Sequence, residues 1–98
     1  MSFLADSNII IYAIIGKHNA AIEFISETFP SVSVITKMEV LGYHNLDRTQ
    51  FDEFLNFFKI INVIPLTNPI VNKTIEIRKY RKIKLADAII EQLLLLAI

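Results

Sequence analysis

The sequence predicts a three-layer α/β/α fold in a single domain over residues 1–98, with a parallel sheet of about three strands. The length of 98 residues suits one domain. Short β-branched runs alternate along the chain with longer segments of helical periodicity. The hydrophobic fraction of 53% at zero net charge excludes intrinsic disorder. Strands that alternate with helices indicate a parallel sheet with helices on both faces.

The expected strands are short, apolar and rich in β-branched residues. The first is too brief for a helix and ends at Asp6, and the third has Pro65 near its end. They cover residues 3–5, 32–35 and 60–66.

The expected helices follow from periodic apolar residues and from residues typical of helix ends. Thr36 and Glu39 have the spacing of a capping box, and Asn68 with Pro69 is typical of a helix start. Phe57 lies outside the apolar stripe of its helix and could contact a partner. The helices are expected over residues 8–15, 19–29, 36–43, from 47 or 48 to at least 58, from about 68, and 85–98.

The zero net charge hides a segregated basic segment. Residues 73–84 carry six basic side chains and the single acid Glu76, a local charge of +5. Such a segment can attract a polyanion toward a carboxylate site, or it can be an ordinary solvated helix face.

Several classes of protein are excluded by what the sequence lacks. Without cysteine there is no disulfide scaffold and no cysteine-ligated zinc site. With Gly16 and Gly42 as the only glycines, there is no glycine-rich phosphate loop. No apolar run approaches the roughly 20 residues that span a bilayer. The N-terminus lacks the basic start of a signal peptide, so we expect a cytoplasmic protein.

Three acids are the candidate chemical groups. Asp6 follows the first expected strand, Glu39 lies just after the second, and Asp87 opens the last helix. Ligands of parallel sheets bind beyond the carboxyl ends of the strands, where these acids would converge. Converging carboxylates require a cation, and oxygen ligands favour Mg²⁺ or Mn²⁺. Such a metal can activate water toward a phosphodiester.

Each acid also has a purely structural interpretation. Asp6 could cap the first helix. Glu39 could belong to the capping box. Asp87 suits the positive end of a helix dipole. Glu91, one turn after Asp87, could pair with a basic side chain or reach the same metal.

Three segments together resemble PIN domains, in particular the VapC-type toxins of toxin–antitoxin pairs. Residues 3–12 (FLADSNIIIY) resemble the opening strand, D-[ST]-[NS] and apolar helix of that family. Residues 33–43 (SVITKMEVLGY) are similar to its block S-x-x-T-x-x-E-L-x-x-G, and residues 83–90 (IKLADAII) to L-x-x-x-D-A-x-I-A-A. The order and spacing match, and the resemblance covers the whole chain.

The resemblance implies an endoribonuclease that depends on Mg²⁺ or Mn²⁺ and cleaves an RNA substrate. It assigns Asp6, Glu39 and Asp87 as catalytic, metal-binding acids. It also assigns a supporting role to Thr36 and to Ser7 or Asn8. Arg81, Lys82 and Lys84 would contact the RNA backbone, and a small antitoxin protein would bind the toxin.

Compared with that family, the chain looks shortened at its C-terminus. Family members continue for about 30 residues with further strands and a fourth acid, so three strands are expected here where the family has five. Glu91 is the nearby substitute for the missing acid. The strand at 3–5 becomes a sheet edge, and residues 93–98 are strongly apolar. Exposed edges and apolar faces seek partners, so we expect a homodimer or higher homo-oligomer.

A second hypothesis comes from another class of protein. The chain could be a catalytically inactive, truncated PIN remnant that acts as a dimerisation or antitoxin-binding module.

Overall fold

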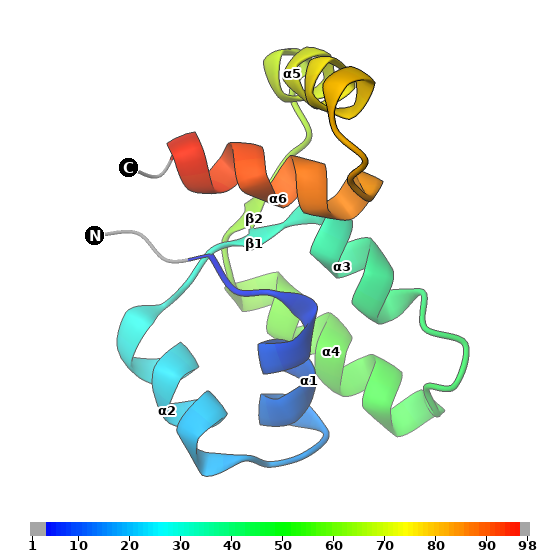
Figure 1. Ribbon diagram of the computed structural model, residues 1–98. Helices are drawn as coiled ribbons and strands as arrows, with labels where there is room; N and C mark the ends of the chain where they lie inside the picture. Colours follow the sequence, from blue (N-terminus) through cyan, green and yellow to red (C-terminus); the bar gives the residue numbers. More distant parts are fainter. Residues whose placement is uncertain (1–3, 97–98) are drawn as a thin grey trace.

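The computed structural model describes residues 4–96. In that range six helices and two short strands follow one another (Figure 1). The elements are α1 (Ser7–Ile14), α2 (Asn19–Thr28), β1 (Val32–Ser33), α3 (Val34–Leu41), α4 (Arg48–Ile60), β2 (Val63–Ile64), α5 (Asn68–Tyr80) and α6 (Leu85–Leu96). All six expected helices are therefore confirmed, each starting within about two residues of its predicted position.

The predicted three-layer α/β/α fold with about three parallel strands is wrong. The structure is mostly helical, and its two strands, which are parallel, contain two residues each. Val32 pairs with Val63 and Ser33 with Ile64. The first expected strand is reduced to one parallel bridge between Leu4 and Ser31, and Phe3 lies outside the described residues.

The strands are short because helices take over the residues beside them. Val34 and Ile35, expected in a strand, begin α3 because the Ser33 hydroxyl oxygen accepts a hydrogen bond from the Ile35 amide at 3.0 Å. At the other strand, Ile60 still belongs to α4, and the Ile61 amide donates to the Phe57 carbonyl at 3.2 Å.

The helix caps differ from expectation in three places. The predicted capping box of Thr36 and Glu39 is wrong, since α3 begins before Thr36. A capping box forms instead at α4, where the Asp47 side chain accepts from the Gln50 amide at 2.8 Å. The cap of α5 is Thr67 rather than Asn68.

Two hydrophobic clusters lie on either side of the strand pair. The larger one joins α1, α3 and α4 around Ile10, Val40 and Phe54, and Val32 of β1 belongs to it. The smaller one joins α5 and α6 through Ile70, Ile89 and Leu93, with Ile64 of β2 packed against it. Val63, which precedes Ile64 in β2, packs on the larger cluster instead, because successive strand residues face opposite sides.

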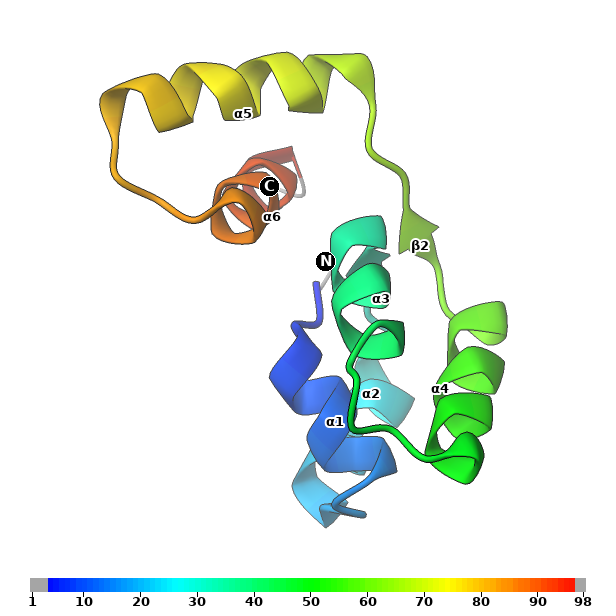
Figure 2. The ribbon, with the colours of Figure 1, turned by 90° about the vertical axis from the view of Figure 1, so that its right-hand side faces the viewer.

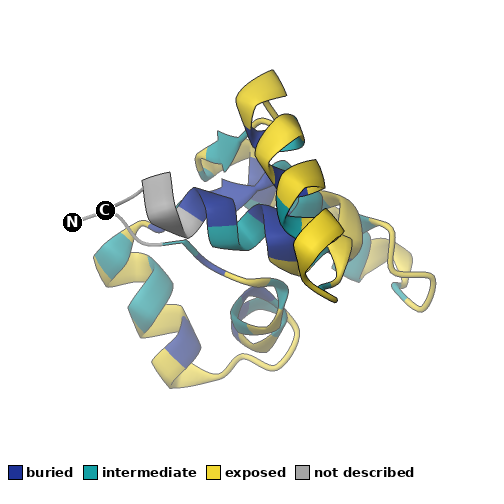
Figure 3. Ribbon diagram, turned by 45° about the horizontal axis from the view of Figure 1, so that its top comes forward, coloured by how far each residue is buried: buried dark blue, intermediate teal, exposed yellow. Residues whose placement is uncertain are grey.

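Helices α5 and α6 pack against each other and cross at a steep angle, on one side of the other four helices (Figure 2). Helix α6 lies between α5 and the rest of the molecule, and α5 is exposed over most of its length (Figure 3). This pair of helices meets the rest of the molecule through Leu4, Ile35 and Ile64, which pack on the smaller cluster. The apolar side chains after Leu93, which were expected to seek a partner, lie outside the described side chains.

Among the described residues, no single helix is long and apolar enough to cross a membrane, and α1 with α2 reaches that length only as a pair bent by 115°.

Candidate functional site

The three candidate acids lie on three helices that are neighbours in space. Asp6 directly precedes α1, Glu39 lies within α3, and Asp87 lies in the first turn of α6. Helix α3 packs against both α1 and α6, which places it between the other two (Figure 1). All three acidic residues are exposed. The acids thus lie on or next to packed helices and do not converge at a sheet edge as expected.

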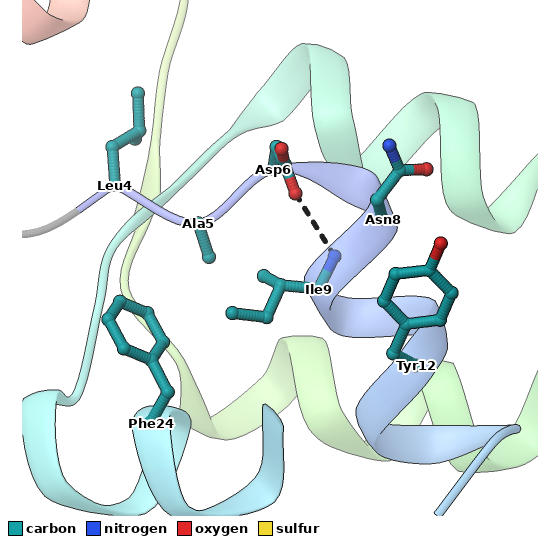
Figure 4. A pocket seen from close by; sticks show the side chains of 7 residues that line it. All are labelled: Leu4, Ala5, Asp6, Asn8, Ile9, Tyr12 and Phe24. Atoms are coloured by element: carbon teal, nitrogen blue, oxygen red, sulfur yellow. Dashed lines mark hydrogen bonds between the residues drawn. The ribbon is translucent and has the colours of Figure 1, made fainter. Parts of the chain in front are cut away.

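Asp6 caps α1, as its structural interpretation predicts. Its carboxylate oxygen accepts a hydrogen bond from the Ile9 amide at 3.0 Å (Figure 4). This bond turns the carboxylate back toward its own helix. One lone-pair direction of Asp6 is therefore already used within the chain.

Two hollows flank the start of α1. The first, about 360 Å³ in volume, contains Asp6 with Asn8 and Tyr12 (Figure 4). The apolar remainder of its lining is formed by Leu4, Ala5, Ile9 and Phe24.

The second hollow, about 190 Å³ in volume, is lined by Ser7 and Ile11 of α1 and by Glu39, Val40 and Tyr43 from the α3 side. The structure therefore places Asn8 with Asp6, and Ser7 with Glu39. Asp87 lines neither hollow.

The described residues do not present a ready metal site. Over residues 4–96, no group of three or more histidine, aspartate or glutamate side chains stands close enough to hold a metal ion. Mg²⁺ and Mn²⁺ prefer several oxygen ligands around one point. The acids as arranged here do not fit a three-carboxylate cation site.

The remaining predicted site residues have varied surroundings. Thr36 is 1% exposed, and its hydroxyl has no hydrogen-bond partner among the described residues. The Glu91 carboxylate accepts a hydrogen bond from the Arg81 guanidinium at 2.6 Å, so these two predicted site residues pair with each other. Lys82 and Lys84 are exposed in the segment that joins α5 to α6.

Two features of the surface were missed by sequence reasoning. One is the position of Tyr12 and Tyr43 beside the acids, which their i,i+4 spacing from Asn8 and Glu39 could have indicated.

The other is an apolar hollow of about 490 Å³ between the C-terminal ends of α2 and α4. Phe29 and Ile60 project at its rim, with 85% and 86% of their surface exposed. Phe57, which was singled out for lying off its helix stripe, lines the same hollow.

Comparisons with known proteins give a structural likeness. No family model matches the sequence, and no curated protein matches it significantly. The fold is similar to a chain of a toxin–antitoxin complex from Klebsiella pneumoniae, with a TM-score of 0.79 and 26% sequence identity. The alignment covers 98% of this chain and 80% of that chain. That chain belongs to a two-component complex, so the likeness is consistent with either component.

Proposed function

We propose that this protein is the toxin component of a toxin–antitoxin pair, with the PIN-like character that its three sequence segments suggest. The observation that carries the proposal is the likeness to a chain of a toxin–antitoxin complex over 98% of the present chain. The three segments favour the toxin over the antitoxin, because each segment holds one of the acids expected in the toxin, Asp6, Glu39 or Asp87.

In this proposal the substrate is RNA. Its phosphodiester is cleaved beside Asp6, Glu39 and Asp87, the acids carried by the segments of α1, α3 and α6. Arg81, Lys82 and Lys84 lie between α5 and α6, just before the helix that carries Asp87. Cations at that position would hold the RNA backbone, and binding would weaken with salt as counterions compete.

Mg²⁺ or Mn²⁺ is the cofactor proposed for Asp6, Glu39 and Asp87, although the acids as they stand do not form a three-ligand group. Asp6 would have to exchange its bond to the Ile9 amide for a metal bond. The three acids offer exposed carboxylates to the proposed site. Ser7 lies in the same hollow as Glu39, and Asn8 lies in the same hollow as Asp6.

The alternative function is an inactive module that binds a partner protein. The absence of a three-acid group in residues 4–96 favours it, as does the apolar hollow with Phe29 and Ile60 at its rim. An apolar segment of a small antitoxin protein would bury both side chains there.

Metal binding tests the toxin proposal. Calorimetric titration with Mn²⁺ should show binding to the wild type and none to Asp6→Asn, and an RNA cleavage assay with Mg²⁺ should follow the same pattern. The matched control is Asp47→Asn, because Asp47 is also a helix-capping aspartate. Asparagine caps helices as well as aspartate does, so neither variant should lose stability.

Absence of both Mn²⁺ binding and metal-dependent cleavage in the wild type would contradict the nuclease and favour the alternative. In that case the protein encoded beside this one should bind it, and Phe29→Ser and Ile60→Ser should each weaken the complex. Ile75→Ser, on the exposed side of α5, is the control that should not.

We also expect a homodimer or higher homo-oligomer. Sedimentation at micromolar concentration tests this directly, and a monomer there would contradict it.

A further inference from the structure

Two tyrosines line the two hollows at the start of α1, one in each hollow and each with one of the acids. Tyr12 lines the hollow of Asp6 and is 59% exposed. Tyr43 lines the hollow of Glu39 and is 53% exposed. Rings of this size are normally more buried than this, and tyrosine at a wet surface is typical of a binding site.

Neither ring is covered by stacking on its neighbouring histidine. Tyr12 and His18 have ring centroids 6.4 Å apart at an interplanar angle of 45°. Tyr43 and His44 are 5.4 Å apart at 54°. Both pairs are tilted rather than parallel, so neither histidine is stacked face to face on its tyrosine.

The helical period explains why α1 serves both hollows. Asn8 and Tyr12 are four residues apart and form one stripe, which lines the Asp6 hollow. Ser7 and Ile11 form the neighbouring stripe, which lines the Glu39 hollow. One ridge of α1 therefore separates two hollows of similar make-up, each with an acid, a short polar side chain and a tyrosine. In Figure 4 the Asn8 amide and the Tyr12 ring lie on the same side of α1.

We propose that Tyr12 and Tyr43 stack two bases of unpaired RNA, one base in each hollow. This inference rests on the proposed function and narrows its substrate to single-stranded RNA. A base presents a flat face to each ring, and the Asn8 amide, with one donor and one acceptor group, suits a base edge. Bases inside a duplex are stacked on one another and cannot reach either tyrosine.

RNA is favoured over a peptide as the occupant because of charge. The basic segment at 73–84 leads into α6, and α6 packs against α3, the helix that carries Glu39. A polyanion would be held by that segment, while a neutral peptide would gain nothing from it.

The test uses binding rather than cleavage. A ten-nucleotide RNA with one 2-aminopurine is titrated with protein in EDTA, because the fluorescence of this base falls when it stacks. Tyr12→Leu and Tyr43→Leu should each weaken binding by about fivefold to a hundredfold and reduce the quenching. Tyr12→Phe and Tyr43→Phe should keep both, since the ring rather than the hydroxyl group makes the contact.

The control is Phe29→Leu, which removes an even more exposed ring that lies in neither hollow. It should change neither affinity nor quenching. Equal binding of a duplex of the same sequence, unchanged quenching in the leucine variants, or tyrosine variants that lose only a protein partner would each overturn the inference. Quenching without any RNA cleavage would support the stacking and contradict the nuclease activity alone.

Discussion

The Arg81 guanidinium binds the Glu91 carboxylate at 2.6 Å, across the turn between α5 and α6. The two residues were expected to do different things: Arg81 to contact RNA and Glu91 to help hold a metal. As an ion pair, each neutralises the other. Their side chains are 55% and 37% exposed, so the pair is open to competition from salt and from a polyanion.

Glu91→Gln should release Arg81 for RNA. We expect tighter binding of single-stranded RNA, with a salt dependence steeper by about 0.7 for one added phosphate contact. Stability should change by less than about 1 kcal/mol, because the pair is exposed. Fluorescence anisotropy at several salt concentrations measures the first effect and urea unfolding the second. Asp52→Asn, which breaks the exposed Arg48–Asp52 pair on α4, makes the same charge change far from the basic segment and should leave the slope unchanged.

Asp6→Ala should destabilise the protein by about 1 kcal/mol, whereas Asp6→Asn should have little effect. The reason is the bond from the Ile9 amide, which asparagine can still accept and alanine cannot. Chemical denaturation of the two variants measures the difference. Equal stability of Asp6→Ala and wild type would mean that the cap does not hold α1 in solution.

Thr36→Val should stabilise the protein by about 1 kcal/mol, because it removes a buried hydroxyl group without a partner. Thr36 is the third residue of α3, so the residue four positions earlier is Val32 of β1, and there is no helical carbonyl for the hydroxyl to reach.

Thr74→Val is the contrasting variant. The Thr74 hydroxyl donates to the Ile70 carbonyl at 2.7 Å, so its removal should be neutral or destabilising. Thermal unfolding compares the two. If Thr36 supports the proposed site, Thr36→Val gains stability and loses RNA cleavage together, an outcome that packing alone would not produce.

Phe29→Gly should also stabilise the protein, by about 1 kcal/mol. Phe29 ends α2 with a φ of 43°, in the left-handed region that glycine adopts without strain. Its ring is 85% exposed and contributes little packing in the isolated chain. Urea unfolding tests this, with Phe54→Gly as the opposite extreme because Phe54 is fully buried. A loss of stability in Phe29→Gly would show that the ring is covered in solution.

The helices could be predicted from the sequence, but the fold class could not. Apolar spacing located α4, for example, because four phenylalanine and leucine residues repeat at helical intervals. Val34 and Ile35 are β-branched and suggest a strand, yet a single hydrogen bond to the Ser33 side chain commits them to α3. Propensities of this kind are weak and yield to local capping.

The placement of the candidate residues could be predicted only at the level of their helices. The sequence motifs single out the segments of α1, α3 and α6, and in the structure α3 packs against both of the others. The alignment of individual side chains could not be predicted, because it depends on contacts between residues far apart in the chain. Asp6 turns to its own helix, and Ser7 joins Glu39 rather than Asp6.

The pair of α5 and α6 is joined to the other helices by the smaller hydrophobic cluster. Units attached through few buried contacts open at a lower free energy than the whole molecule unfolds. Asp87 and the basic segment belong to the pair of α5 and α6, whereas Asp6 and Glu39 belong to the other unit. Amide hydrogen exchange should therefore be faster in α5 and α6 than in the buried parts of α1, α3 and α4. Each such opening would separate Asp87 and the basic segment from Asp6 and Glu39, so the proposed site would be complete only while both cooperative units are closed.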